Sequence, residues 1–231
     1  MALQAAGVSV EWVTGGEAAV EAHALLLESL GVANVEDLDS FMETLAPSHD
    51  GRVTTRMMCA SDGKGILAVV AGARLARLNA AMLLYSAVRK DWRRKGIYSA
   101  LRSRVLDALQ NEEGRPLDYV ISELESGGLL WRYYRYTWDS WVVPCDYRVP
   151  GTRGLTPRAL DLVIVPVARR PATAEVADIV REIYEGVYRL VPSDASVEYR
   201  SVVQSIPSDE SGKDVRGRPG DRENIDPSGR H

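Results

Sequence analysis

The sequence predicts a mixed α/β fold, and two observations carry that prediction. The first is the order of elements, because segments patterned like strands alternate with segments of helical spacing as β-α-α-β-β-β-α-β-α-β-β-α. The second is a central strand–loop–helix–strand unit, which is flanked by hairpins early and late in the chain. Ligand sites in such sheets tend to lie at a unit of this kind, so it is the first place to look for function.

The first half of the chain predicts four strands and two helices. Gly31 is a plausible C-cap for the first helix, and "SDGKG" is a good hairpin connection between two of the strands. The stretch "AAMLLYSAV" is nearly all apolar, which is typical of a strand covered on both faces. The predicted elements are a strand at 7–13, helices at 16–31 and 35–46, and strands at 52–60, 65–75 and 80–88.

The second half predicts three helices and three strands. Apolar residues recur at helical spacing from Ile97 to Leu109, and Gly114-Arg115-Pro116 should end that helix. Thr173 is a plausible N-cap for the last helix. The predicted elements after the helix at Ile97 are a strand at 117–124, a short aromatic helix at 128–138, strands at 141–149 and 159–168, and a helix at 173–191.

The chain divides into one predicted domain, residues 1–206, and a tail, residues 207–231. A length of 231 residues is enough to bury a sizeable core. From Pro207 onward, Val215 and Ile225 are the only sizeable apolar side chains. Such a segment cannot bury enough surface to offset its ordering entropy, so we expect the tail to be disordered.

Composition excludes several classes of function. The net charge of −4 disfavours a general nucleic-acid binder, and no apolar run reaches the length of a spanning helix, so we expect no membrane segment. The N-terminus lacks the pattern of a secretory signal, and two cysteines make no disulfide framework, so a cytoplasmic protein is expected. No two of the three histidines lie at a metal-ligand spacing, so no metal site is expected.

The segment "VRKDWRRKGIYSAL", residues 88–101, has the features of an anion site. A strand ends at Val88 and a helix begins near Gly96 or Ile97, and the first N–H groups of that helix lack intrahelical partners. Gly96 lets the backbone approach a ligand closely, and the neighbouring basic side chains add positive charge. The segment therefore predicts a phosphate or pyrophosphate cradle, the alternative being an ordinary solvated basic loop.

The same segment resembles the acyl-CoA loop of the GCN5-related N-acetyltransferase (GNAT) superfamily, whose pattern is Arg/Gln-x-x-Gly-x-Gly/Ala. Arg93 and Gly96 fall on its fixed positions, and Val88, Trp92 and Leu101 on its wider pattern. The resemblance implies a mostly antiparallel central sheet flanked by helices, with acetyl-CoA as the acyl donor. Main-chain groups of 93–98 would bind the pyrophosphate and the strand end the pantetheine arm. The implied coenzyme-binding residues are Ala87, Val88, Arg93, Arg94, Lys95, Gly96, Ile97, Tyr98 and Ser99.

The segment departs from the superfamily pattern at two positions. Tyr98 stands where Gly or Ala is usual, and Lys90 stands where Pro is common. A bulky side chain at position 98 must turn away from the pyrophosphate, or it would crowd it.

The resemblance also implies catalytic residues. Amine acetylation needs a base for the amine and an acid for the leaving thiolate. The strand after the loop helix ends with Glu123 and Glu125, and we take Glu123 as the base, the alternative being that both are simply solvated. The segment "LLWRYYRYTW" resembles the superfamily's Leu-Tyr stretch, which makes Tyr134 the candidate acid and Tyr133 the next. The usual Gly-Phe is replaced by Thr137-Trp138, and packing is the alternative role of this aromatic cluster.

The leading hypothesis is therefore direct acetyl transfer from acetyl-CoA to a primary amine of a small molecule or protein. A non-catalytic acyl-CoA-binding or sensing protein on the same fold is the alternative. Cys145 could carry an acyl group, but no histidine lies near it in the sequence to activate it. The acceptor should meet residues 16–50 and 141–160, whose early part is acidic. The helix at 173–191 has an apolar stripe that should pack on the domain or on a second subunit, so a homodimer is possible.

Overall fold

The computed structural model describes residues 7–46, 51–112, 114–151, 153–193 and 196–207. Nearly all of the tail predicted from residue 207 onward therefore lies outside the described residues. The strands are β1 (Ser9–Val13), β2 (Val53–Ser61), β3 (Ile66–Leu75), β4 (Ala80–Val88), β5 (Tyr119–Leu124), β6 (Trp141–Val142), β7 (Arg148–Val149), β8 (Arg158–Ala159) and β9 (Asp161–Pro166). The α-helices are α1 (Gly16–Leu30), α2 (Leu38–Leu45), α3 (Ile97–Asn111), α4 (Leu129–Thr137), α5 (Val176–Glu182) and α6 (Val197–Ser205).

Seven strands form the main sheet in the order β1-β2-β3-β4-β5-β9-β6. Only the β4–β5 pair is parallel, so the sheet is mostly antiparallel, as expected. The short strands β7 and β8 pair with each other in a separate hairpin. Strand β3 is buried along its whole length because the sheet is covered on both faces.

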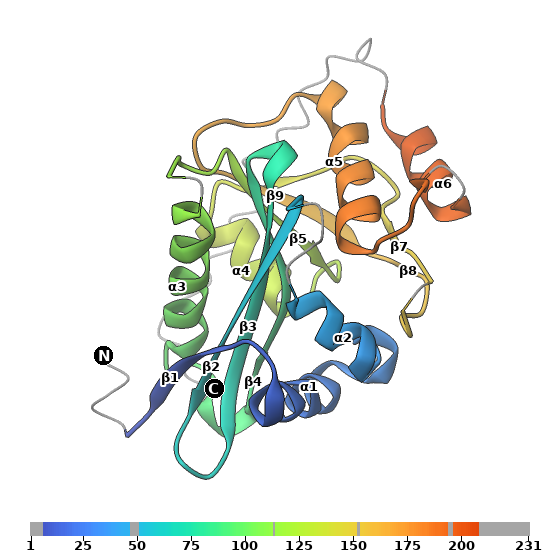
Figure 1. Ribbon diagram of the computed structural model, residues 1–231. Coiled ribbons are helices and arrows are strands. Elements are labelled where there is room, and N and C mark those ends of the chain that lie inside the picture. The colour runs from blue at the N-terminus through green and yellow to red at the C-terminus, as the bar shows by residue number, and fades with distance from the viewer. Residues whose placement is uncertain (1–6, 47–50, 113, 152, 194–195, 208–231) are drawn as a thin grey trace.

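The helices divide between the two faces of the sheet (Figure 1). Side chains alternate along β3, so Val70 faces α3 and α4, whereas Val69 and Ala73 face the opposite side. On that opposite side, α1 and α2 cover one end of the sheet and α5 and α6 cover the other. Among the described residues no single helix is long and apolar enough to cross a membrane, although Gly16–Leu30 and Val32–Leu45, bent by 110°, pass that test as a pair.

Strand β4 separates from its neighbour β5 part-way along its length. Its first residues pair with β5 from Ala80–Tyr119 to Leu83–Ser122, and beyond that point the two parallel strands no longer pair. A β-bulge lies at the same place, because Tyr85 pairs with Ala71 and Leu83 with Gly72, leaving one extra residue in β4. The prediction of a strand covered on both faces is therefore wrong for its middle, where residues 83–86 are only half-buried.

Two further predictions are corrected by the structure. The predicted strand at 141–149 is two short strands, because Pro144 offers no N–H and the chain bends there. The predicted helix at 173–191 is a 3-10 turn followed by α5 and a π-helical turn, Ile183–Val187, and its buried face packs on the sheet of its own chain.

The helix α6 was not predicted. Ser196 caps it by accepting a hydrogen bond from the Tyr199 backbone N–H at 3.2 Å, which is a standard N-cap signal. Tyr199 and Val202 of α6 pack in the same core cluster as α5, so the two helices form a C-terminal layer over the sheet.

Candidate functional site

A cavity of about 830 Å³ lies where β4 and β5 diverge. Its lining combines the unpaired part of β4, the start of α3, the end of β5, α4, and segments of the α1–α2 and β7–β8 regions. Ser122 and Glu123 are neighbours in β5 and point to opposite faces of the sheet, yet both line the cavity. The cavity therefore passes between the diverging strands from one face to the other. Its size is that of an ordinary cofactor or ligand site.

The N-terminus of α3 forms one end of the cavity. The first intrahelical hydrogen bond runs from the Ala100 N–H to the Gly96 carbonyl at 3.1 Å. The N–H groups of Ile97, Tyr98 and Ser99 therefore have no acceptor within the helix and are available to an anion. Gly96 has φ +78°, and a Cβ built there would meet no atom within 4 Å. Glycine suits this position because its backbone is left-handed, and the space in front of it is open to a ligand, as the sequence prediction requires.

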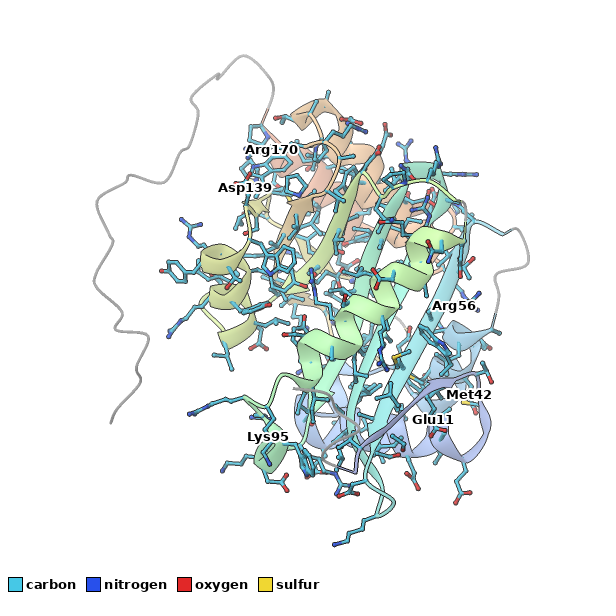
Figure 2. All side chains as sticks on the ribbon, turned by 90° about the vertical axis from the view of Figure 1, so that its left-hand side faces the viewer. Glu11, Met42, Arg56, Lys95, Asp139 and Arg170 are labelled. Atoms are coloured by element: carbon cyan, nitrogen blue, oxygen red, sulfur yellow. The ribbon has the colours of Figure 1, made fainter. Side chains whose placement is uncertain are left out.

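The three basic side chains differ in position. Arg93 donates from Nε to the Val88 carbonyl at 3.0 Å, which ties the loop to the end of β4. The Lys95 ammonium lies 4.3 Å from the centre of the Trp92 ring. Arg93 and Arg94 line the cavity, whereas Lys95 stands at the end of α3 and points outward (Figure 2).

The end of β4 presents an open edge to the cavity. Ala87 and Val88 pair with β3 on one side only, since β5 has already diverged from them. Both residues line the cavity close to the start of α3, and the Val88 carbonyl, on the side away from β3, accepts the hydrogen bond from Arg93. The structure thus brings together the predicted strand end, the loop and the helix N-terminus, with Lys95 at the margin.

Tyr98 turns away from the N-terminus of its helix. Its hydroxyl lies 3.4 Å from the hydroxyl of Tyr134, and its ring packs edge-on against Tyr133. Burial raises the pKa of Tyr98, with the Tyr134 hydroxyl adding to the effect, so the phenol stays neutral. The side chain therefore fills the contact between α3 and α4 and leaves the free N–H groups uncovered.

Tyr134 occupies the cavity wall on the α3 face. Its ring is 1% exposed, and its hydroxyl accepts from Arg102 Nε at 3.3 Å and from Ser122 Oγ at 3.4 Å. The Arg102 guanidinium also lies 4.3 Å from the centre of the Trp138 ring, at the position where the superfamily has Phe. Tyr133 is half-buried and makes no such polar contacts among the described residues. Of the two tyrosines, Tyr134 has its hydroxyl fixed.

Glu123 lies on the opposite face, where two tyrosines fix its carboxylate. Tyr147 donates to Oε1, and Tyr188 donates to Oε2 at 2.6 Å. Burial raises the pKa of Glu123 above its ordinary value, and the two hydroxyl donors and the nearby Arg158 partly offset that rise. Glu125 lies beyond the end of β5 and is 74% exposed, with Arg158 at 3.7 Å. The two glutamates therefore have different surroundings, because β5 ends at Leu124, between them.

Tyr147 and Tyr188 were missed in the sequence analysis. Tyr188 follows the π-helical turn, in which its N–H bonds to the Ile183 carbonyl at 3.1 Å. A π-helical turn adds one residue per turn and is frequent at functional sites. No local sequence signal marks either tyrosine, because the contact with Glu123 joins segments far apart in the chain.

Other reactive side chains lie outside this arrangement. Burial raises the pKa of Cys145 to about 11, so its thiol is protonated at neutral pH and is a poor nucleophile. His23 is buried and its Nε2 lies 2.8 Å from the Glu36 carbonyl, which is a structural contact. Across the described ranges no group of three or more His, Cys, Asp or Glu could hold a metal ion.

No protein-family model and no curated protein matches the sequence. Solved structures do match the fold. A GNAT-family acetyltransferase from Bacteroides thetaiotaomicron aligns with a TM-score of 0.55 and 15% identity over 78% of this chain and 99% of its own. The ribosomal-protein-S18-alanine N-acetyltransferase of Escherichia coli gives 0.51 and 13% identity over 71% and 96%.

The diaminobutyrate acetyltransferase EctA of Paenibacillus lautus, solved with its substrate and coenzyme A, gives a TM-score of 0.50 and 16% identity over 72% of this chain and 99% of its own. These likenesses confirm the GNAT fold that the resemblance of residues 88–101 implied. They also show that this chain extends beyond the length of the proteins it resembles.

Proposed function

We propose that this protein is an N-acyltransferase that moves an acetyl group from acetyl-CoA to a primary amine by direct attack. The observation that carries the proposal is one cavity lined at once by the free N-terminus of α3, the open edge of β4, Glu123 and Tyr134. On the GNAT fold, these four features would serve, in that order, as a pyrophosphate site, a path for the thioester arm, a base and an acid.

The coenzyme half of the proposal depends on main-chain groups. The pyrophosphate would accept hydrogen bonds from the N–H groups of Ile97, Tyr98 and Ser99, with Arg93 and Arg94 neutralising its charge. The pantetheine arm would pair with the open edge of β4 at Ala87 and Val88. The thioester would then reach the gap between β4 and β5.

The catalytic half places a base and an acid on either side of that gap. Glu123, with its raised pKa, would take the proton that the amine loses as it attacks the thioester carbonyl. The Tyr134 hydroxyl would give a proton to the departing thiolate and be resupplied through its contacts with Ser122 and Tyr98. The bond formed is the amide C–N bond and the bond broken is the thioester C–S bond, so no covalent enzyme intermediate is needed.

The same proposal places the reaction in the cytoplasm, where acyl-CoA is supplied. The unpaired thiols of Cys59 and Cys145 suit a reducing compartment.

The test has two stages. Acetyl-CoA should raise the melting temperature of the purified protein in proportion to the logarithm of its concentration, because it binds only the native state. An amine panel read out as free thiol should then show transfer. No shift at millimolar acetyl-CoA would refute the proposal. A shift without thiol release for any amine would favour the alternative of an acyl-CoA-binding protein without catalysis.

A further inference from the structure

The acceptor half of the cavity is covered by a strap, which we define as residues 153–158. The strap is hydrogen-bonded through its main chain to the segment that joins α1 and α2. The Thr156 N–H donates to the Ala33 carbonyl at 3.2 Å, and the Asp37 N–H donates to the Arg153 carbonyl at 3.3 Å. These bonds bring two stretches of backbone together over the face of the sheet that carries Glu123.

A buried ion pair reinforces the strap. Arg153 Nε lies 3.3 Å from Glu36 Oε1, and the two side chains are only 9% and 4% exposed. Arg153 also donates to the Ser40 carbonyl, and Thr44 donates to the other oxygen of Glu36 at 2.9 Å. Opening the strap would separate the buried Arg153 and Glu36 charges, which is unfavourable.

Gly154 lets the two stretches approach this closely. Its φ is +80°, and a Cβ at this position would lie 3.0 Å from the Asp37 backbone nitrogen. Any other residue would push the strap away from the α1–α2 segment, so a closed strap depends on this glycine.

Arg158 extends the cover toward the end of β5. Its Nη1 contacts the Asn34 side-chain oxygen and lies 3.7 Å from Glu125 Oε1. One guanidinium therefore joins the α1–α2 segment, the strap and the residues just beyond β5. The N-terminus of α3, where the coenzyme would enter, lines another part of the same cavity.

The walls beneath the strap combine apolar side chains with two polar groups of residues, one of them Asn34, Glu36, Thr44 and Arg158 and the other around Glu123. The hydroxyl-bearing residues Tyr85 and Tyr188 belong to the group around Glu123. Burial raises the pKa of Tyr85, so its hydroxyl stays neutral and can hydrogen-bond to an amine. The apolar residues lining this part of the cavity are Leu84, Val149, Leu155, Leu160 and Val187.

From this geometry we infer that the acceptor is a small free primary amine with a short apolar body, and that a polypeptide amino group is excluded. The inference rests on the proposed function and names its acceptor class. A compact amine fits beneath the strap with its nitrogen toward Glu123. A polypeptide that continues between the strap and the α1–α2 segment would have to break their main-chain hydrogen bonds and the buried Arg153–Glu36 pair.

The experiment uses the full chain at saturating acetyl-CoA with free thiol as the readout. The acceptors are a panel of short alkylamines, diamines and arylalkylamines, set against pentapeptides with a free N-terminus and N-blocked pentapeptides with one lysine. At least one small amine should exceed every peptide by about 100-fold or more in kcat/KM, because the rejection is steric.

Comparable turnover of peptides and small amines would overturn the inference while leaving the proposed function standing. The inference would also be overturned if acetyl-CoA raised the melting temperature but no small amine gave turnover. If acetyl-CoA produces no shift, the proposed function fails first and the inference fails with it.

A pair of variants tests the strap itself. Arg158→Ala removes the link between Asn34 and Glu125 and should raise peptide kcat/KM about tenfold or more. Arg148→Ala removes an exposed arginine from the neighbouring strand β7, outside the cavity lining, and should leave peptide turnover at the wild-type level. Equal peptide turnover in the two variants would show that the strap does not select the acceptor.

Discussion

The coenzyme end and the acceptor end of the cavity are built in different ways. The coenzyme end comes from one continuous segment, from Ala87 to Ser99, and offers mostly main-chain groups. The acceptor end comes from side chains of distant segments, as in the contacts of Tyr147 and Tyr188 with Glu123. A main-chain site depends on backbone conformation and can be recognised locally, whereas a side-chain site exists only after the whole chain has folded. Side-chain substitutions should therefore affect the acceptor end most, and backbone-altering substitutions the coenzyme end.

The largest effect is expected from Glu123→Gln. The amide cannot accept the amine proton, so kcat/KM should fall about 1000-fold, while acetyl-CoA affinity should stay within the error of measurement. The base acts as a carboxylate, and burial raises its pKa above the ordinary 4.5. The wild-type rate should therefore rise as pH increases through that raised pKa, and the variant should lose this dependence.

Glu125→Gln provides the matched comparison, since Glu125 is exposed beyond the end of β5. This substitution should lower kcat/KM by less than about threefold, because an exposed charge pair contributes little energy. A larger loss in Glu125→Gln than in Glu123→Gln would make Glu125 the base.

Tyr134→Phe should have the next largest effect. Removing the hydroxyl removes the proposed proton donor to the thiolate, so kcat should fall about 100-fold with KM for acetyl-CoA nearly unchanged. Tyr133→Phe removes the half-buried neighbouring hydroxyl and should retain most of the rate. Full turnover by the Tyr134 variant in steady-state assays would contradict the acid assignment.

Gly96→Val tests the coenzyme end through its backbone. The left-handed conformation at φ +78° is costly for a β-branched residue, so acetyl-CoA should bind about tenfold more weakly. Asn tolerates this conformation, and Gly96→Asn should bind acetyl-CoA more tightly than the Val variant. Both are measured by titration calorimetry. Equal affinities for wild type and the Val variant would refute the role of this turn.

The elements around the proposed coenzyme end could be predicted from the sequence because they are local. The strand ending at Val88, the glycine before α3 and the amphipathic helix are local patterns, and the structure brings them together. The left-handed backbone of Gly96 could not be predicted, because the sequence cannot distinguish a need for φ above zero from a need for space. Lys95 is predicted to act with the two arginines, but it is absent from the cavity lining, and its ammonium lies over the ring of Trp92, which does line the cavity.

The acceptor end could not be predicted to the same degree. Glu123 was identified from its place at a strand end, but its two tyrosine partners lie 24 and 65 residues away in the chain. The strap depends on contacts such as Arg153 with Glu36, between residues whose local sequences are those of ordinary loops. Such pairings arise from tertiary packing and leave no periodic signal.

The smallest expected effect, Tyr188→Phe, tests whether the C-terminal layer acts on the site. The Tyr188 hydroxyl donates to Glu123 Oε2 and so favours the charged carboxylate, which lowers the pKa of Glu123 against the effect of burial. Without that donor the pKa should rise further, and the acidic limb of the pH–rate profile should move to higher pH. The neutral-pH rate should fall by about threefold.

Tyr184→Phe is the control for this prediction. It removes a hydroxyl from the same aromatic cluster, but that hydroxyl donates to the Arg148 carbonyl and makes no bond to Glu123. Its pH–rate profile should match that of the wild type. A shifted limb in Tyr188→Phe alone would tie the π-helical turn to the protonation of the base, because Tyr188 follows this turn and, in the described part of the chain, is the hydroxyl donor to Oε2. Identical pH–rate profiles for the two variants would instead show that Tyr188 only packs against its neighbours and does not set the pKa of Glu123. Among the described residues, Tyr147 would then be the one hydroxyl donor that acts on Glu123.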